Sequence, residues 1–553
     1  MAIFYFIIGH PHMMIHVRFT VMICAFATMM AMSGCQSLPN NPHLPKSQAL
    51  TEEVQKRHQA LKQGTSSNGL ISAINAQSSD HPELSGYYPI ATGANAFAAR
   101  STLSDMANQS IDIQYYIWHN DEAGQLMLKD LWEAADRGVI VRLLLDDFNS
   151  SPDLDQLLLR VAKHPNIAIR LMNPMAYRNI RSVNYLLHPV RSNKRMHNKS
   201  MTFDNKISVI GGRNIGNEYL NNAPVNNFAD LDVMLIGRVV SEITDSFESY
   251  WSSPLSYDIE TLVVDDKKHA LNGVKFAVFN EVKASKNSSE SERALRTYRQ
   301  AMQNSTIGQD LLASRVPFFW TNIDLMVDDV IKLKGLSHPN DYLVSQLQNK
   351  LGQPHDKLSI ISSYFVPTKD GVKTLSALSK MGVKVSILTN SFDATDVGIV
   401  HAGYAHWRKE LLKSGVKLFE IKSSAQSAKD NENRFWRTRH HTTTSLHAKA
   451  FAVDDSQVFI GSYNVDPRSA NINTELGVLI EDKKLAQQLH SALSNSEALS
   501  HQAYELKLND AGNIEWHTIE DGQAVIHTKE PRMDTKDRLV IGIVGWMPID
   551  WLL

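Results

Sequence analysis

The chain repeats one residue pattern at a constant distance, and this repeat limits the folds open to it more than any other feature. Each copy has a histidine, a lysine two residues later, an aspartate five residues after the lysine and an asparagine ten residues after the aspartate. Every member of the second copy follows its counterpart by 250 residues. A repeat of this length predicts two similar halves, packed face to face about a pseudo-twofold axis. The members are His197, Lys199, Asp204 and Asn214 in the first copy and His447, Lys449, Asp454 and Asn464 in the second.

Each half also carries the same order of expected secondary structure. In the first half, β-type runs at residues 110–118 and 139–145 enclose an amphipathic helical stretch at residues 124–137. Strand, helix and strand over about 35 residues predict a βαβ unit with a parallel strand pair. The second half repeats this order, so the sequence predicts the α/β class for both halves. Its strand, helix and strand are expected at residues 358–366, 371–380 and 383–388.

The spacing within each motif brings its histidine and lysine together. Residues i and i+2 of a β-strand point to the same face, so His197 and Lys199 project together, as do His447 and Lys449. Apposing the two halves then places two imidazoles and two ammonium groups at one point. Such a cluster binds the negative oxygens of a phosphodiester and needs no metal ion. A single histidine on a strand is equally compatible with a hydrogen-bonded core residue, but two copies at one offset argue against that alternative.

The amino terminus predicts an export signal. Arg18 precedes an apolar stretch at residues 19–32, which ends in Ser33-Gly34-Cys35. A positive residue, a short apolar core and small residues before a cleavage point are typical of a signal peptide, expected here at residues 1–34. The Ser-Gly-Cys ending resembles a bacterial lipobox, which implies that Cys35 is lipidated and begins the mature chain. The alternative is an unprocessed apolar start.

Length, charge and cysteine content narrow the remaining possibilities. A chain of 553 residues exceeds one ordinary domain. Its formal net charge of -2 argues against a general nucleic-acid binder, which would carry a basic field. The two cysteines are Cys24 and Cys35, so removal of the signal peptide would leave no pair to form a disulfide.

Both motifs resemble the HKD signature of the phospholipase D superfamily. The similarity to its bacterial cardiolipin synthases rests on residues 113–118, 145–147, 195–200, 211–218 and 459–468, and it covers most of residues 86–500. The resemblance implies two α/β/α sandwich halves with one shared active site. The expected division is a signal peptide at 1–34, a tether at 35–85, a first half at 86–255, a connecting segment at 256–345, a second half at 346–500 and an extension at 501–553, whose apolar end is either interfacial or part of a core.

The family mechanism, carried over residue by residue, implies a role for each motif member. His197 is expected to be the nucleophile that forms a phosphohistidine, and His447 the acid and base for the leaving and entering alcohols. The resemblance implies no metal and no cofactor. The residues expected to stabilise charge on the phosphorus are Lys199, Lys449, Asn214 and Asn464, those expected to orient the histidines are Asp230 and Glu475, and those expected to complete the motifs in a structural role are Asp204 and Asp454.

A basic run lies directly before the first motif, at Arg191, Lys194 and Arg195. A solvated face is one interpretation of such a run. Its closeness to His197 favours a second interpretation, in which these residues guide a phosphate to the site.

The function implied by the resemblance is phosphatidyl transfer from a phospholipid to phosphatidylglycerol, which forms cardiolipin. The alternatives are a hydrolytic phospholipase D, in which water is the acceptor, and a nuclease of the same superfamily, which the neutral charge disfavours. Phospholipids and a membrane surface are the expected partners, without nucleic acid or an obligatory metal, and the oligomeric state stays open. We expect a lipoprotein that faces the periplasm, with the outer membrane favoured because Gln36, and not an aspartate, follows Cys35.

Overall fold

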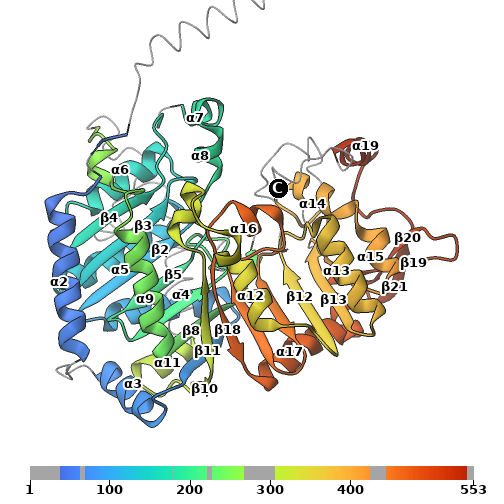
Figure 1. Ribbon diagram of the computed structural model, residues 1–553, viewed down its shortest axis with the longest axis horizontal. Coiled ribbons are helices and arrows are strands. Elements are labelled where there is room, and N and C mark those ends of the chain that lie inside the picture. The colour runs from blue at the N-terminus through green and yellow to red at the C-terminus, as the bar shows by residue number, and fades with distance from the viewer. Residues whose placement is uncertain are drawn as a thin grey trace, which may run out of the picture.

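The computed structural model describes residues 38–40, 42–62, 69–178, 180–220, 227–266, 305–423 and 444–544. These residues form two similar α/β halves that lie side by side, the first at the left of Figure 1 and the second at the right. Each half is built around its own sheet, so the predicted fold class is confirmed. The predicted signal peptide, Cys35 and residues 545–553 lie outside the described residues.

The first half is built on a nine-stranded sheet. In spatial order its strands are β10 (Phe319–Thr321), β1 (Ser85–Ile90), β8 (Asp232–Gly237), β6 (Ile207–Gly211), β5 (Ser200–Phe203), β2 (Ser110–Tyr115), β3 (Ile140–Asp146), β4 (Ile167–Met172) and β9 (Ser256–Asp258). Strands β2, β3 and β4 run parallel, as the predicted βαβ unit requires. Strands β5 and β6 form an antiparallel hairpin beside β2, and this hairpin follows the first motif.

The second half is built on a ten-stranded sheet with the same central arrangement. In spatial order its strands are β11 (Ile323–Val327), β18 (Leu476–Glu481), β17 (Gln457–Gly461), β16 (Lys449–Val453), β12 (Lys357–Ser362), β13 (Lys384–Asn390), β14 (Lys417–Ile421), β19 (Ala503–Leu508), β20 (Ile514–Glu520) and β21 (Gln523–His527). Strands β12, β13 and β14 are parallel, and β16 and β17 form the hairpin. The order from β18 to β14 therefore repeats the order from β8 to β4.

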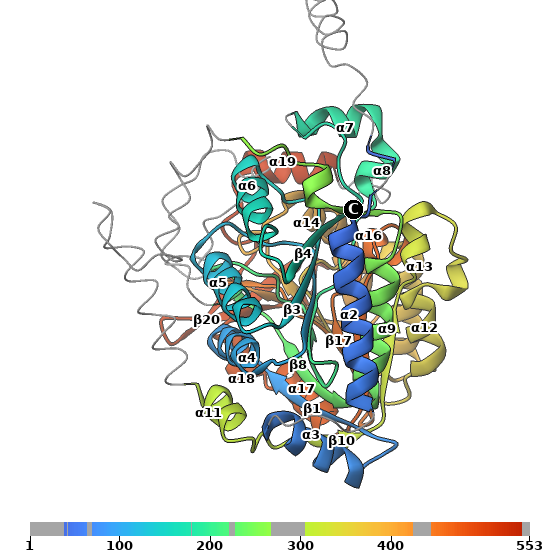
Figure 2. The ribbon, with the colours of Figure 1, turned by 90° about the vertical axis from the view of Figure 1, so that its left-hand side faces the viewer.

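Helices cover the sheets, and in the first half α4, α5 and α6 lie along one face (Figure 2). Among the helices of the described residues, none is both long enough and apolar enough to cross a bilayer. The α-helices are α2 (Pro45–Lys62), α3 (Gly69–Asp80), α4 (Gly93–Met106), α5 (Glu122–Asp136), α6 (Pro152–Val161), α7 (Arg181–Leu187), α8 (Pro189–Asn193), α9 (Arg238–Trp251), α11 (Thr306–Leu312), α12 (Leu343–Leu351), α13 (Thr368–Lys380), α14 (Gly398–Ala405), α15 (Arg408–Lys413), α16 (Pro467–Asn471), α17 (Lys483–Ser494), α18 (Ser496–Ser500) and α19 (Thr535–Val544). Short 3-10 helices occupy Ile259–Thr261, Val330–Lys334 and Pro339–Asp341.

Alternating side chains of the central strands join the two halves. In β8, Met234 packs into the core of the first half, whereas its neighbours Val233 and Leu235 pack into a core shared with the second half. In β17, Phe459 packs within its own half, and its neighbours Val458 and Ile460 face the shared core. Successive side chains of a strand point to opposite faces, so one apolar run supplies both cores. The sheets therefore pack face to face, with α9 and α17 beside the contact.

The segments expected to connect and extend the halves also supply strands to the sheets. From residues 256–345, β9 and β10 lie at the edges of the first sheet, and β11 lies at one edge of the second. From residues 501–553, β19, β20 and β21 extend the second sheet beyond β14. Strands β9, β10 and β11 have only three to five residues and carry too little alternation for their sequence to reveal them.

Much of the expected tether is packed against the first half. Helix α2 runs along this half (Figure 1), with Val54 and Leu61 buried. The side chain of His58 forms a 2.8 Å hydrogen bond with the Ser110 hydroxyl, and Arg57 donates to the carbonyl oxygens of Gln109 and Gly138. From α2 onward, the described part of residues 35–85 is therefore packed on the first half and is not a free tether.

Candidate active site

Both motifs lie at the edge of the sheets where the parallel strands end. His197 and Lys199 form an extended segment immediately before β5, and β5 runs antiparallel to β2 with Ser200 opposite Gln114 near the carboxyl end of β2. In the second half, Lys449 is the first residue of β16, and His447 lies two residues before it. The histidines and lysines of both copies are at least 92% buried.

The two halves exchange backbone hydrogen bonds at the histidines. The amide of His197 donates to the carbonyl oxygen of Thr474 over 2.9 Å, and the amide of Thr474 donates to Arg195 over 3.0 Å. In the second motif, β15 (Thr444–Leu446) pairs in parallel with β7 (Asn227–Ala229), and the amide of His447 donates to Ala229 over 2.8 Å. Each motif is thus held by the other half.

Each imidazole also takes its acid from the other half. Nδ1 of His197 lies 2.8 Å from a carboxylate oxygen of Glu475, and Nδ1 of His447 lies 2.6 Å from a carboxylate oxygen of Asp230. A ring nitrogen donates to a carboxylate, so this bond fixes the tautomer and the direction of the ring. Nε2 is then the reactive atom of each ring. The structure therefore brings together all four residues that the sequence predicted as histidine and orienting acid.

The lysines lie beside the histidines of their own motifs. Nζ of Lys199 donates to the carbonyl oxygen of His197 over 2.6 Å, and Nζ of Lys449 donates to that of His447 and lies 3.1 Å from its Nδ1. Burial lowers the pKa of Lys199 to about 7 and that of Lys449 to about 8. Both lysines lower the pKa of both imidazoles, as expected if the four groups share one site.

The asparagines of the motifs point their amide oxygens at the protein. Oδ1 of Asn214 accepts from the amide of Ile117 over 3.2 Å, and Oδ1 of Asn464 accepts from the hydroxyl of Ser363 over 2.8 Å. Because the oxygen of each amide is engaged, its NH₂ group is the end suited to an anion. The role of both residues in stabilising charge on the phosphorus stays a prediction.

The two histidine–acid pairs differ in charge. Burial raises the pKa of Glu475 to about 7, despite the opposing charge of Lys199. Burial acts in the same direction on Asp230, but the charge and hydrogen bond of His447 outweigh it and lower the pKa of Asp230 to about 2. Burial and the lysine charges lower the pKa of His197 well below its usual value and that of His447 to about 4.

The residues behind the two acids differ as well. Ser462 donates its hydroxyl to Glu475 and accepts from the amide of Leu476 over 3.0 Å. Its counterpart in the first half, 250 residues earlier, is Gly212. A Cβ atom at Gly212 would lie 2.2 Å from Oδ1 of Asp230, so the carboxylate occupies the space that a side chain would need. The shorter acid is therefore matched to a glycine and the longer acid to a serine.

Two tyrosines that the sequence analysis did not select pack against the histidines. The ring of Tyr116 meets that of His197 edge to face with centroids 4.8 Å apart, and Tyr219 meets His447 in the same way at 5.1 Å. Tyr116 could have been found from the sequence, because residues 113–116 match residues 361–364 of the second half. Nothing in the sequence marks Tyr219. Arg468 is a further residue that the sequence did not single out, and its charge also lowers the pKa of His197.

Asp204 and Asp454 lie away from the histidines, at the far ends of the strands that follow the motifs. The carboxylate of Asp204 accepts the backbone amides of Asn108, Gln109 and Ser110 at 2.7–3.2 Å. Asp454 accepts three backbone amides in the same way, those of His355, Asp356 and Lys357. Each aspartate thus fixes the start of the neighbouring parallel strand, β2 or β12.

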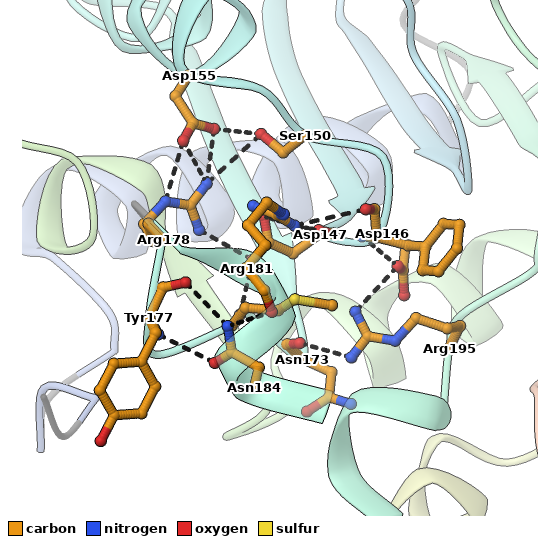
Figure 3. A network of polar contacts seen from close by, with 12 residues as sticks. Asp146, Asp147, Ser150, Asp155, Asn173, Tyr177, Arg178, Arg181, Asn184 and Arg195 are labelled. Atoms are coloured by element: carbon orange, nitrogen blue, oxygen red, sulfur yellow. Dashed lines mark hydrogen bonds and ion pairs between the residues drawn. The ribbon is translucent and has the colours of Figure 1, made fainter. Parts of the chain in front are cut away.

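The basic run before the first motif is partly a buried support. Arg195 is fully buried and lies 3.2 Å from a carboxylate oxygen of Asp146, whose other oxygen accepts the amide of Met196 over 2.8 Å (Figure 3). Asp146 ends β3, so its carboxylate fixes the backbone directly before His197. The solvated-face interpretation is therefore wrong for Arg195, whereas Arg191 and Lys194 are partly exposed.

One group of side chains among the described residues has the closeness of metal ligands, namely His119, Asp121 and Glu218. Nδ1 of His119 lies 3.0 Å from Glu218, while Asp121 accepts the amides of Gly124 and Asn217. These contacts hold the start of α5 and the loop before Tyr219. The group is accounted for as a structural network beneath that tyrosine.

Two similar α/β halves around one shared set of acid-linked histidines and lysines define the class of two-motif phospholipase D-like proteins. The family model described as "Cardiolipin synthase, PLD-like domain" matches residues 102–251 and 347–496, which is more than half of the chain. The chain is also 39% identical over 484 residues to cardiolipin synthase C of Escherichia coli K12, an alignment that covers 88% of this chain and 99% of that protein. The chain therefore belongs to the cardiolipin synthase family of the phospholipase D superfamily.

Two further similarities extend the comparison. An uncharacterised protein of Helicobacter pylori J99 is 32% identical over 456 residues, covering 81% of this chain and 86% of that protein. The crystal structure of a phosphatidylserine synthase from Haemophilus influenzae matches the fold with a TM-score of 0.53 at 13% identity, covering 87% of this chain and 98% of that one. At this identity the second similarity concerns the fold alone.

Proposed function

We propose that the protein is a phosphatidyltransferase that forms cardiolipin from phosphatidylglycerol and a second phospholipid through a phosphohistidine. The observation that carries this proposal is the buried cluster of two acid-linked imidazoles and two lysines. A phosphodiester fits this cluster because it offers negative oxygens to the ammonium groups and a phosphorus atom to an imidazole. The likeness to cardiolipin synthase C supports lipids as the substrates.

In the first step, neutral His197 attacks the phosphorus of the donor lipid through Nε2. The bond between phosphorus and the leaving alcohol breaks, and protonated His447 gives its proton to the oxygen of that alcohol. Lys199 and Lys449, with the amide groups of Asn214 and Asn464, stabilise the negative charge that gathers on the phosphoryl oxygens. The product of this step is a phosphatidyl group bound to His197.

In the second step, His447 is neutral and takes the proton from a glycerol hydroxyl of phosphatidylglycerol. The oxygen attacks the phosphorus, the bond between phosphorus and His197 breaks, and cardiolipin leaves. Donor and acceptor alcohols therefore pass through the same place beside His447, as the two-step exchange of one proton requires.

The unequal acids support this division of roles. Asp230, whose pKa is low, is a full negative charge beside His447 and favours a protonated imidazole there. Glu475, whose pKa burial raises to about 7, offers less negative charge to His197, which favours the neutral ring that a nucleophile needs. The phosphate of a bound lipid adds further negative charge, which raises the pKa of His447 toward the protonated state.

The experiment that tests the function is product analysis by mass spectrometry. Purified protein incubated with phosphatidylglycerol and a second, isotopically distinct phospholipid should give cardiolipin that carries both labels. Replacement of His197 or His447 by Ala should lower turnover by about 10²-fold or more. Phosphatidic acid as the main product would show that water is the acceptor and would favour the hydrolytic alternative.

The cellular placement is also part of the proposal. Lipidation of Cys35 after removal of residues 1–34 would hold the protein on the periplasmic side of a bacterial envelope membrane, where its substrates lie. The proposal includes a membrane surface and phospholipids as partners and no nucleic acid. Metabolic labelling with a fatty acid, compared between the natural chain and Cys35→Ser, tests the anchor.

A further inference from the structure

The segment between β4 and His197 carries a helical pair, α7 and α8, whose apolar side chains face outward. Of the seven residues of α7, all of which the structure describes, Asn184 alone is fully buried. Six apolar side chains on this pair and beside it are exposed instead, with Leu186 at 58% and Val190 at 69%. Single exposed apolar side chains are common in soluble proteins, but a contiguous group of them marks an interaction surface. This apolar tip consists of Phe148, Ile180, Tyr185, Leu186, Leu187 and Val190.

Polar contacts hold the helical pair rigidly in this orientation (Figure 3). The side-chain amide of Asn184 donates to the carbonyl oxygen of Tyr177 over 2.8 Å and accepts its amide over 3.0 Å. Arg178 forms ion pairs with Asp147 at 2.9 Å and with Asp155 at 2.6 Å, which ties the entry to α7 to the end of β3. The apolar side chains are thus presented outward by a buried network and are not the result of a loose loop.

A second contact ties the exit of the pair to the sheet. The side-chain amide of Asn173, at the end of β4, donates to the carbonyl oxygens of Arg191 and Lys194 at 3.0 and 2.8 Å. Arg195 donates to the carbonyl oxygen of Asn173 over 2.9 Å. Both ends of the helical pair are therefore fixed to the ends of β3 and β4 in the first sheet.

The segment that carries the tip is basic, and the nearby carboxylates of Asp147 and Asp155 are paired with Arg178. Residues 156–203 contain no Asp or Glu, whereas they contain nine Lys or Arg residues. Arg191 and Lys194 at the base of the pair are partly exposed, and His188 at its turn is exposed. An apolar tip above a basic base complements a surface that is apolar inside and negatively charged at its headgroups.

The tip also connects directly to the active site. The ring of Phe148 stacks on that of Tyr116 with centroids 5.5 Å apart, and Tyr116 packs against His197. Beyond α8, the chain reaches His197 after three further residues. In Figures 1 and 2 the pair projects from one end of the molecule, and α19 of the second half lies at the same end.

From these observations we propose that the apolar tip inserts into the headgroup layer of an anionic phospholipid bilayer and so holds the active site at the membrane surface. The inference rests on the proposed function, because it gives the lipid-handling site its partner surface. A lipid then needs to leave the bilayer only by the distance between the tip and His197, along the rings of Phe148 and Tyr116.

The first test replaces the tip residues and compares two presentations of the same lipid. The full chain with Leu186→Asp and Val190→Asp acts on vesicles of phosphatidylglycerol and phosphatidylethanolamine, and separately on dihexanoyl phosphatidylglycerol as dissolved monomers. We expect the ratio of vesicle to monomer turnover to fall at least about tenfold, because two large apolar side chains no longer enter the bilayer. The matched control is Leu312→Asp with Met381→Asp, since both side chains are 67% exposed and lie outside the tip.

The second test reads insertion without any turnover. In the full chain with Cys24→Ser and Cys35→Ser, an environment-sensitive fluorophore is attached at Leu187→Cys or, as a control, at Leu312→Cys on α11, at the opposite end of the molecule (Figure 1). Vesicles with phosphatidylglycerol should shift the emission to the blue at the first position alone, and phosphatidylcholine vesicles should do so less.

The outcomes separate this inference from the proposed function. An unchanged turnover ratio in the tip variant, or equal emission at both probe positions, would overturn membrane docking while cardiolipin formation stands. A tip variant that changes from dimer to monomer with no change at vesicles would assign the tip to contact with a second copy, which also overturns it. A blue shift in a protein that makes no cardiolipin from either form of the lipid would leave docking in place and reject the proposed function.

Discussion

At the scale of single residues, each histidine is oriented by an acid from the other half, and the two acids set the charge around the two imidazoles. Glu475 and Asp230 each orient an imidazole more than 200 residues away in the chain, and they differ in length, in pKa and in the residue behind them. These differences give two equivalent motifs unequal surroundings. Burial and the lysines lower the pKa of both imidazoles, and the full charge of Asp230 makes His447 the one that a bound phosphate can bring to the protonated state.

Removing the charge of one acid tests its positioning role. We expect Glu475→Gln to lower kcat by about 10²-fold, because a neutral amide accepts from Nδ1 of His197 without stabilising the charge that develops on the ring. Glu481→Gln is the matched control, since Glu481 is exposed and ends β18, the strand that Glu475 immediately precedes. Near-normal turnover in Glu475→Gln, with the melting temperature of the natural chain, would contradict the role of this acid.

The buried lysines predict how activity depends on pH. In the proposed reaction their ammonium groups bind the phosphate, and burial lowers the pKa of Lys199 to about 7 and that of Lys449 to about 8. The binding form is the protonated one, so it is complete below these values and is lost as the pH rises through them. We expect kcat/KM for phospholipid to fall between about pH 7 and pH 9, and a flat profile to pH 10 would contradict this.

Most of the residues of the site could be predicted from the sequence, whereas their pairing could not. The constant offset selected His197, His447 and their lysines, because a strand spacing places them on one face. The family pattern supplied Asp230 and Glu475, but which acid serves which histidine depends on how the halves dock. Tyr219 escaped notice for the same reason, since its contact with His447 crosses between halves and has no local pattern.

At the scale of elements, the third member of each motif acts through a strand. Asp204 and Asp454 adopt φ angles of 53° and 47°, in the left-handed region, at the turn of the hairpins that follow the motifs. From there each carboxylate accepts three backbone amides at the start of a neighbouring strand. These bonds therefore fix the hairpin in register with the neighbouring parallel strand. They also fix the position of the motif histidine at the opposite end of the hairpin.

Asp204→Asn should therefore reduce stability more than chemistry. The amide retains one acceptor oxygen and adds an NH₂ group that faces backbone donors, so we expect a loss of about 2 kcal/mol in the free energy of unfolding. Thermal unfolding measures this loss, and the folded fraction should keep kcat within a few-fold. Asp455→Asn serves as the control, because this half-buried neighbour of the second motif contacts the side chains of Lys357 and Gln487 and not backbone amides. A large fall in kcat without a fall in stability would point to a catalytic role.

Long elements were predictable, and short ones were not. The helix expected at residues 124–137 is α5, which begins at Glu122 because the side chain of Asp121 caps it by accepting the amide of Gly124. The expected strands at 139–145 and 383–388 correspond to β3 and β13. Helices α7 and α8 were missed because their apolar residues face outward, which removes the periodicity that identifies a helix packed on a core.

At the scale of the whole molecule, the shared core between the sheets makes the halves one folding unit. Val233 and Leu235 from the first sheet meet Val458 and Ile460 from the second, and all four are fully buried. The sequence predicted this face-to-face packing from the repeat alone. It did not predict that residues 256–345 would add edge strands to both sheets, because such short strands depend on partners already in place.

A single substitution in the shared core tests this unity. Ile460→Ala removes a buried side chain and should lower the free energy of unfolding by about 2–5 kcal/mol. Calorimetry should show one transition that moves to lower temperature as a whole, because both sheets lose the contact. Ile526→Ala on β21 is the control, since its side chain is 55% exposed. Two separate transitions, of which one stays in place, would show that the halves unfold independently.

The exchange of acids also determines when, during its synthesis, the chain becomes able to react. A growing polypeptide presents His197 long before Glu475 has been added, and His447 reaches its acid only after the second half has folded onto the first. An unfinished chain, or one cut between its halves, thus has imidazoles that nothing orients. On the proposed function, such a chain leaves phospholipids unaltered until its last strands have docked.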